Sequence, residues 1–428
     1  MKLPRYPEYR DSGVEWLGAV PGDWDVARLK SKVSLVTEKA KQRTRAVALE
    51  NVESWSGRFI PTGGEFEGEG VAFCKGDLLF GKLRPYLAKV YLADEPGEAV
   101  GDFHVIRAVR GFEPRFLQYQ ILNRSFIDIV DGTTFGSKMP RASWEALGGM
   151  PVMVPSIAEQ RAIAIFLDRE TAKIDTLLAE QERLLALLAE KRQAAISHAV
   201  SKGLNPDAPK KDSGMQWLGE VPAHWDIVPL RHVSKIGNGS TPNRDNPAYW
   251  AEAGTPWLNS SVVNQIEVTS SDQYVTPVAL RECHLPVVAP PAILVGITGQ
   301  GRTRGMASPL KFEATISQHI AYVKPVASVL DVNYLRNFLE CSYFRLREES
   351  DAAGSTKGAI TCDQLSRLKV PLPPINEQVD IAGKISSDIS KMDSLSDAAI
   401  RSKEILLERR AALIAAAVTG RIDVREVA

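Results

Sequence analysis

The sequence contains few of the residues that usually build a metal site or a disulfide framework. It has only four cysteines and six histidines among 428 residues. The cysteines (Cys74, Cys283, Cys341 and Cys362) lie far apart and without CxxC spacing, so we expect reduced thiols rather than a zinc site or disulfides. The scattered histidines do not suggest a set of metal ligands.

Long apolar runs are also missing. No run approaches the roughly eighteen residues that a membrane-spanning helix needs. The opening segment, MKLPRYPEYRDSG, lacks the apolar stretch of a secretory signal. With 44% hydrophobic residues, the composition is typical of a globular protein, and we expect it in the cytoplasm. A chain of this length should form two or more domains.

Net charge is absent as well, since 52 basic residues balance 52 acidic ones. This balance excludes a uniformly basic coat for nucleic acid. It does not exclude a local basic groove, because affinity for phosphate depends on where the positive charges lie.

The common catalytic motifs are not found. There is no GxxxxGK[ST] loop of an ATP motor, and no HExxH, GxSxG or paired-carboxylate motif. The glycines at Gly299 and Gly301 resemble a dinucleotide fingerprint, but its third glycine would fall on Arg304 and prevent close packing of helix and strand. The LPPI at 372–375 lacks the polar first residue and the aromatic of the DPPY or NPPY tetrapeptide of an amino-methyltransferase. We therefore expect no enzyme activity from this chain alone.

The sequence does contain an internal repeat. DSGVEWLGAVPGDWDV, from residue 11, recurs as DSGMQWLGEVPAHWDI from residue 212, with ten of sixteen positions identical. VMVPSIAEQRAIAIFLD at 152 corresponds to VPLPPINEQVDIAGKIS at 370, and EKRQAAISHAV at 190 to ERRAALIAAAV at 408. The offset grows from 201 to 218, so the interior of the second half has seventeen extra residues. Similar ends and different interiors indicate two versions of one module with different targets.

Two segments, 157–204 and 375–428, contain no proline and are rich in Ala, Leu, Glu, Lys and Arg, which favour helix. A heptad pattern fits both in the same phase, starting at Leu167 and at Ile385, and continues through about five heptads. A helix of about 44 residues would span roughly 66 Å. The matched length and phase favour two long helices packed on each other, and ordinary amphipathic helices in a bundle are the alternative.

Between these shared ends lie segments of about 27–150 and 228–368, with short β-like runs such as FHVIRAV and AILVGIT separated by Gly and Pro. We interpret each as an α+β domain with a substantial mixed or antiparallel sheet, so the predicted fold class is α+β. The predicted boundaries are 1–155 for the first globular domain, 156–206 for a central helix and linker, 207–374 for the second globular domain and 375–428 for a C-terminal helix.

Basic loops that contain glycine are the candidates for a binding site. Residues 75–91 have four basic residues and one acidic residue, and residues 296–311 have three basic residues and no acidic one. GSKMPR at 136–141 and GSTKG at 354–358 add further basic and hydroxyl side chains. Lys and Arg neutralise phosphates, Ser, Thr and backbone N–H groups position the DNA backbone, and Arg or Gln can bind base edges. The candidate DNA-binding residues are Lys82, Arg84, Tyr86, Ser137, Lys138, Arg141, Gln300, Arg302, Arg304, Ser355 and Lys357.

Alternatives remain for these residues. A basic loop can simply be a solvated surface, and Tyr86 can belong to the core instead of contacting DNA. Trp16, Trp24, Trp217 and Trp225 recur at matched spacing, and we interpret them as structural anchors of the repeated ends rather than as ligand contacts.

Taken together, these features resemble the specificity (S) subunit of type I restriction–modification systems. The resemblance is carried by the WLGxVPxxWD repeats, by the GSxxK-like stretches that lead into VPSIAEQ and PLPPINEQ, and by the two helix ends EKRQAAI and ERRAALI. It covers nearly the whole chain. One departure is the single proline of VPSIAEQ in the first half, where a double proline is usual.

The resemblance implies that each variable segment is a target recognition domain for one half of a bipartite DNA site. The long helices would form an antiparallel coiled coil that fixes the spacer and gives the repeat an approximate two-fold symmetry. Such a subunit has no catalytic centre and no cofactor of its own. Its implied partners are double-stranded DNA, two methyltransferase subunits that use S-adenosylmethionine, and restriction subunits that use ATP and Mg, with no membrane partner. The alternative function is a non-catalytic coiled-coil scaffold that binds no DNA.

Overall fold

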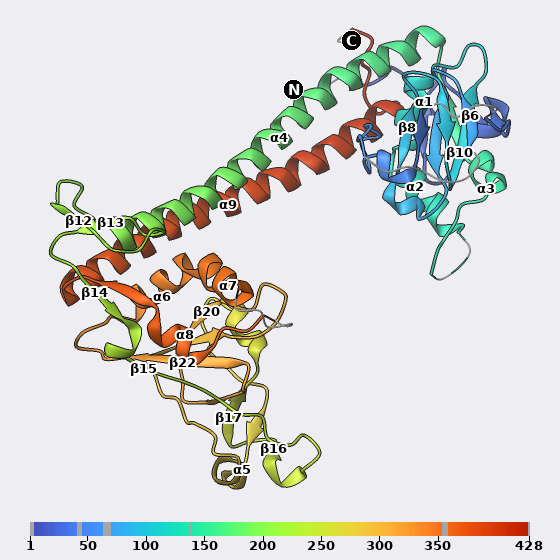
Figure 1. The fold of residues 1–428 in the computed structure, drawn as a ribbon. Helices are drawn as coiled ribbons and strands as arrows, with labels where there is room; N and C mark the ends of the chain where they lie inside the picture. The colour runs from blue at the N-terminus through green and yellow to red at the C-terminus, as the bar shows by residue number, and fades with distance from the viewer. Residues whose placement is uncertain are drawn as a thin grey trace. The chain divides into compact units, whose positions relative to one another are not determined.

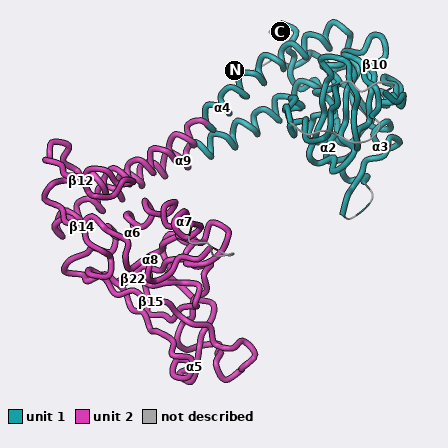
Figure 2. The backbone as a smooth tube through the Cα atoms, viewed as in Figure 1, with its two compact units in different colours: residues 1–182, 399–428 teal, residues 183–398 magenta. Residues whose placement is uncertain are grey.

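The computed structural model describes residues 4–40, 45–62, 70–134, 136, 138–352 and 358–426. The chain forms two compact units (Figures 1 and 2). Unit 1 comprises residues 1–182 and 399–428, and unit 2 comprises residues 183–398. Both units combine short helices with small, mostly antiparallel sheets, in agreement with the predicted α+β class.

The strands of unit 1 are β1 (Tyr9–Asp11), β2 (Ala19–Pro21), β3 (Asp25–Arg28), β4 (Val33–Val36), β5 (Ala46–Val47), β6 (Val71–Phe73), β7 (Leu78–Gly81), β8 (Val90–Leu92), β9 (Gly97–Ala99), β10 (Phe103–Ala108) and β11 (Pro151–Val154). Its short helices are α1 (Pro114–Ile121), α2 (Arg124–Gly132) and α3 (Trp144–Gly149). The central sheet has the antiparallel order β4-β10-β7-β8, and a smaller sheet has the order β5-β9-β6.

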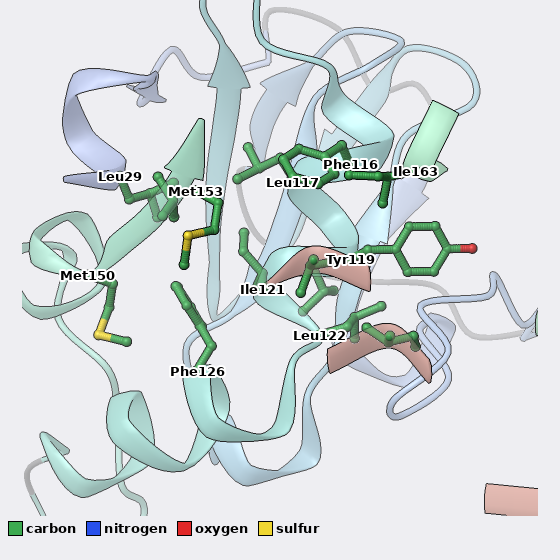
Figure 3. Close-up of a cluster of buried hydrophobic side chains, with 14 of the residues drawn as sticks. Leu29, Phe116, Leu117, Tyr119, Ile121, Leu122, Phe126, Met150, Met153 and Ile163 are labelled. Carbon is green, nitrogen blue, oxygen red and sulfur yellow. The ribbon is translucent and has the colours of Figure 1, made fainter. Parts of the chain in front are cut away.

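The central sheet of unit 1 is buried on both faces. Leu78 and Phe80 of β7 belong to the cluster that includes α1 and α2, whereas Leu79 between them belongs to the cluster with the smaller sheet. Side chains alternate between the two faces of a strand, so a continuous apolar run such as LLFG suits a strand covered on both sides. Figure 3 shows residues of the first cluster, with Phe116 on α1 and Phe126 on α2 among them.

The strands of unit 2 are β12 (Lys210–Asp212), β13 (Glu220–Pro222), β14 (Asp226–Pro229), β15 (Ser234–Asn238), β16 (Trp250–Ala251), β17 (Thr255–Leu258), β18 (Tyr274–Val275), β19 (Ala292–Gly296), β20 (Ala307–Leu310), β21 (Thr315–Ile316), β22 (Ile320–Pro325) and β23 (Lys369–Leu372). Its short helices are α5 (Pro277–Glu282), α6 (Val332–Cys341), α7 (Tyr343–Ala352) and α8 (Cys362–Arg367). The central sheet, β15-β22-β19-β20, repeats the strand order found in unit 1. Most of the extra residues of the second half lie between β15 and β19, where β16, β17, β18 and α5 form a larger lobe.

The two long helices that the sequence predicts are present. They are α4 (Ile157–Lys202) and α9 (Ile375–Val418), with 46 and 44 residues. Each helix is divided between the units, because unit 1 ends at residue 182 of α4 and resumes at residue 399 of α9. Interhelical ion pairs occur within each unit: Asp175–Arg410 at 3.0 Å and Glu182–Lys403 at 2.9 Å in unit 1, and Arg192–Asp393 at 2.9 Å in unit 2. Within the described residues, no helix combines the length and apolar character needed to cross a membrane.

A glutamine at the start of each long helix links the helix to its globular unit. Gln160 accepts a hydrogen bond from the Glu113 backbone N–H at 2.8 Å and donates to the Pro155 carbonyl at 2.9 Å. Gln378 makes the same contacts in unit 2. It accepts from the Asp331 N–H at 2.8 Å and donates to the carbonyls of Pro373 at 2.8 Å and Val329 at 2.9 Å. These buried contacts explain why AEQ and NEQ belong to the repeat.

The repeated tryptophans contribute to the packing of both units: Trp16 and Trp217 are partly buried against the same clusters that contain Trp24 and Trp225. Trp24 and Trp225 are fully buried. The cluster of Trp24 includes Ile414, Ala417 and Val418 from the end of α9, and the cluster of Trp225 includes Ile196, Ala199 and Val200 from the end of α4. Each repeated end therefore packs on the long helix that belongs, by sequence, to the other half of the chain.

Candidate nucleic-acid interface

In unit 1, two of the basic loops predicted from the sequence meet at one end of the central sheet. The Lys82 N–H donates to the Asp102 carbonyl at 2.8 Å, and the Ala142 N–H donates to the Lys82 carbonyl at 2.9 Å. The Arg84 N–H donates to the Pro140 carbonyl at 2.8 Å. The segment after β7 is thus held between the residue before β10 and the segment 140–142.

The side chains at this sheet end form an ion-paired cluster. The Arg141 guanidinium donates to both carboxylate oxygens of Asp102, at 3.2 Å from Nε and 3.0 Å from Nη2. The Lys82 Nζ lies 3.9 Å from Asp102 Oδ1. Arg141 remains 54% exposed, so its charge is accessible to a ligand although it has an acidic partner. The hydrogen bond that Arg141 donates to Asp102 also raises the pKa of Arg141.

Half-buried His104 contacts the loop that carries Arg141. Its Nε2 lies 3.0 Å from the Ala142 carbonyl, and burial lowers the pKa of the imidazole below its usual value. The histidine thus supports this loop beside Lys82 and Arg141.

Arg84 and Tyr86 project from a tight turn beside the cluster. Arg84 (φ 52°) and Ala88 (φ 46°) both adopt the left-handed backbone region, on either side of the 3-10 turn Pro85–Leu87. This region costs free energy for residues with a Cβ, so the turn is held by its surroundings. Tyr86 is 45% exposed, which makes it a surface residue rather than a core residue. Lys138 is exposed, and Ser137 lies outside the described residues.

Unit 2 repeats this framework with different side chains. The Ile297 N–H donates to the His319 carbonyl at 3.0 Å, and the Ile360 N–H donates to the Ile297 carbonyl at 2.8 Å. His319 therefore takes the place of Asp102, directly before the corresponding strand. Thr298 Oγ1 lies 2.8 Å from His319 Nδ1, and Gln318 Nε2 lies 3.3 Å from His319 Nε2.

The glycine-rich loop after β19 is supported by helix α7. Arg347 donates to the carbonyls of Gly301 at 2.6 Å and Arg304 at 3.1 Å, and the Tyr343 hydroxyl donates to the Arg302 carbonyl at 2.9 Å. Gln300 and Arg302 are exposed on this loop.

Arg304 differs from the other candidates because it points into the fold. It is 3% exposed, and its Nη1 lies 2.8 Å from Asp351 Oδ1. Its guanidinium is committed to Asp351 and supports the loop from inside, so in this structure its charge is not offered to a ligand. Ser355 and Lys357 lie outside the described residues.

Sequence reasoning did not identify Asp102, Gln318 and His319. The available signal was their position: Asp102 and His319 stand directly before the apolar strands FHVIRA and IAYVKP. No cluster of three or more potential metal ligands occurs among the residues that the structure describes.

Comparisons with known proteins find several similar chains. The family model for the type I restriction modification DNA specificity domain matches residues 222–398. The putative type I restriction enzyme MjaX specificity subunit of Methanocaldococcus jannaschii is 25% identical over 279 residues, which is 64% of this chain and 60% of that protein. The type I restriction enzyme EcoR124I/EcoR124II specificity subunit of Escherichia coli is 24% identical over 169 residues, 39% of this chain and 41% of that protein. The matched part of the chain thus spans less than two thirds of the length of each of these curated relatives.

A solved chain is similar over almost its whole length. It comes from work on complex assembly and conformational transition of the type I R-M system. The match covers 93% of this chain and 98% of that chain, with a TM-score of 0.74 at 19% identity. At this level of identity, the likeness shows a shared fold.

Proposed function

We propose that this chain is a specificity subunit of a type I restriction–modification system and that it recognises a bipartite DNA sequence, one half-site with each unit. The observation that carries the proposal is the repeated framework with unlike surface chemistry. At the equivalent end of the central sheet, unit 1 has the half-buried Lys82 and the exposed Arg141, whereas unit 2 has the exposed Gln318 and His319. A tandem repeat with equal frames and unequal polar ends suits two unequal half-sites.

The chemistry of the exposed loops supports contact with DNA in two ways. Lys82, Lys138 and Arg302 supply positive charge for phosphates, although the chain as a whole has no net charge. Arg141 and Gln318 carry groups that can bind base edges bidentately in the major groove. Phosphate contacts would fix the register of the protein, and the base contacts would determine the sequence.

We further propose that α4 and α9 pair along their length as an antiparallel coiled coil that sets the spacer between half-sites. The three interhelical ion pairs support one continuous register. From Asp175 to Glu182 the chain advances seven residues, while the partner position moves back seven, from Arg410 to Lys403. From Glu182 to Arg192 it advances ten, and the partner again moves back ten, to Asp393. Such pairing would give the chain an approximate two-fold symmetry.

In this proposal the chain is a non-catalytic subunit that recruits its enzymes. Adenine can be methylated only when it is extruded from the duplex, so the recognition units would hold DNA while a partner reaches the base. The partners would be two methyltransferase subunits with S-adenosylmethionine and restriction subunits with ATP and Mg. The cytoplasmic location stays a prediction from the sequence.

The experiment that tests the proposed function uses the full chain purified with co-expressed methyltransferase subunits. We expect methylation-sensitive sequencing of DNA modified by this complex to give one two-part motif with a fixed gap. A single continuous motif would contradict the coiled-coil spacer. Absence of any sequence preference, together with the absence of salt-dependent duplex binding, would favour the alternative scaffold without DNA binding.

A further inference from the structure

The residue directly before β10 in unit 1 and before β22 in unit 2 occupies an equivalent position in both sheets. In unit 1 the Asp102 carbonyl accepts a hydrogen bond from the backbone N–H of the residue after β7, at 2.8 Å. In unit 2 the His319 carbonyl accepts one from the backbone N–H of the residue after β19, at 3.0 Å. The segment after β7 also forms an isolated β-bridge, Leu83–Arg141, with the loop before α3. The segment after β19 forms the corresponding bridge, Thr298–Ala359, with the loop before α8. The backbone pairing around this position is therefore equivalent in the two units, whereas the side chains differ.

In unit 1 this position has the chemistry to bind a G·C pair. Arg141 uses Nε and Nη2 for Asp102, so the opposite edge of the guanidinium, with its remaining N–H groups, is not used by that carboxylate. This edge matches the N7 and O6 acceptors of guanine. The Asp102 carboxylate can in turn accept a hydrogen bond from the N4 amino group of the paired cytosine.

In unit 2 the equivalent position is occupied by polar side chains that contact one another. His319 contacts Thr298 through Nδ1 and Gln318 through Nε2, and the Thr241 hydroxyl donates to the Gln318 side-chain oxygen. A glutamine amide offers one donor and one acceptor, the combination that matches N7 and N6 of adenine. These contacts fix the orientation of Gln318 before any ligand arrives, which lowers the entropy cost of binding.

We propose that these two equivalent sheet ends are the specificity-determining positions of the chain: Asp102 with Arg141 selects a G·C pair in one half-site, and Gln318 with His319 selects an A·T pair in the other. This inference rests on the proposed function. A purely structural role for the same contacts would have a different effect, because it would weaken binding to all sequences alike and leave the motif unchanged.

The test compares the DNA motif methylated by the wild-type complex with the motifs from single variants of the full chain. Asp102→Asn and Arg141→Lys should each relax one G·C position in one half of the motif, with a loss of discrimination of roughly five- to a hundredfold. Gln318→Ala should relax one A·T position in the other half only. Arg141→Lys keeps the charge and gives a second measurement if Asp102→Asn does not fold.

Two substitutions away from the sheet ends serve as controls. Asp128→Asn removes an exposed ion pair with Arg124 on α2, and His232→Gln changes an exposed histidine of unit 2. Both should leave the two halves of the motif unchanged.

The outcomes separate the inference from the proposed function. A two-part wild-type motif that stays intact in all variants, or that relaxes equally in both halves, overturns the inference and leaves the proposed function standing. A wild-type complex without a two-part motif overturns the proposed function and the inference with it.

Discussion

The glutamine at the start of α9 provides the sharpest test of how the globular units are attached to the long helices. Replacing Gln378 with Leu keeps the side-chain volume approximately but removes the partner of three backbone groups. Val329 is 39% exposed, so its carbonyl can turn to water. The Asp331 N–H and the carbonyl of the buried Pro373 cannot do so easily, and each unsatisfied group costs about 1–3 kcal/mol. Because burial of the leucine side chain offsets part of this cost, we expect the substitution to lower the free energy of unfolding of unit 2 by about 2–4 kcal/mol.

The assay should report on each unit separately, since a chain with two units need not unfold in one step. Hydrogen exchange measured by mass spectrometry resolves peptides from α6 and from α1. In Gln378→Leu, exchange in α6 should accelerate by roughly thirty- to a thousandfold, while α1 behaves as in the wild type. Gln160→Leu should produce the reverse pattern, because that residue makes the corresponding contacts in unit 1.

Gln193→Leu, at an exposed position of α4, is the matched control and should change the free energy of unfolding by less than about 0.5 kcal/mol. If Gln378→Leu left exchange in α6 unchanged, or accelerated α1 and α6 equally, the glutamine would not be the link between helix and unit.

Three further substitutions have defined outcomes. Lys82→Ala should weaken binding to all duplexes alike and lower the salt slope of the affinity by about one, whereas Arg58→Ala, away from the sheet end, should not. Binding isotherms at several salt concentrations measure this, and a change in sequence preference would argue against a phosphate contact. His104 has a lowered pKa in the folded chain, so the unfolded state binds more protons below the ordinary pKa of about 6.5. Its contribution is thus complete above that pH and is lost as the pH falls. His104→Phe should therefore flatten the fall in stability between about pH 7 and pH 5 in urea titrations, and an unchanged slope would exclude the histidine as its source. Arg410→Leu removes the bonds to Asp175 and to the Trp55 carbonyl. It should destabilise unit 1 by about 1–3 kcal/mol in the same titrations, and an unaffected urea midpoint would mean that neither bond contributes.

The long helices were predictable from the sequence because their signal is local. Absence of proline, strong helix formers and a shared heptad phase all act within one segment, and α4 begins at Ile157 and α9 at Ile375, close to the predicted starts at 156 and 375. The repeat was equally visible, and the strand order of both central sheets follows it.

The composition of the candidate site was only partly predictable, because it depends on contacts between distant segments. Lys82 and Arg141 were identified by their charge, but Asp102 joins them only through the order β4-β10-β7-β8, which no local pattern encodes. Arg304 illustrates the opposite error. Its sequence context is as basic as that of Arg302, and only the position of Asp351 on α7 decides that one arginine is buried and the other exposed.

The core of unit 1 combines residues that are far apart in the sequence, and this affects how the unit folds during synthesis. Its core contains Ile414, Ala417 and Val418, and the Asp423 N–H donates to the Pro4 carbonyl at 2.9 Å. A ribosome synthesises Trp24 about 390 residues before these apolar partners. The core of unit 1 therefore keeps an open hydrophobic surface until the segment from residue 414 onward has emerged. A premature stop codon before residue 414 would thus damage the core that contains Trp24.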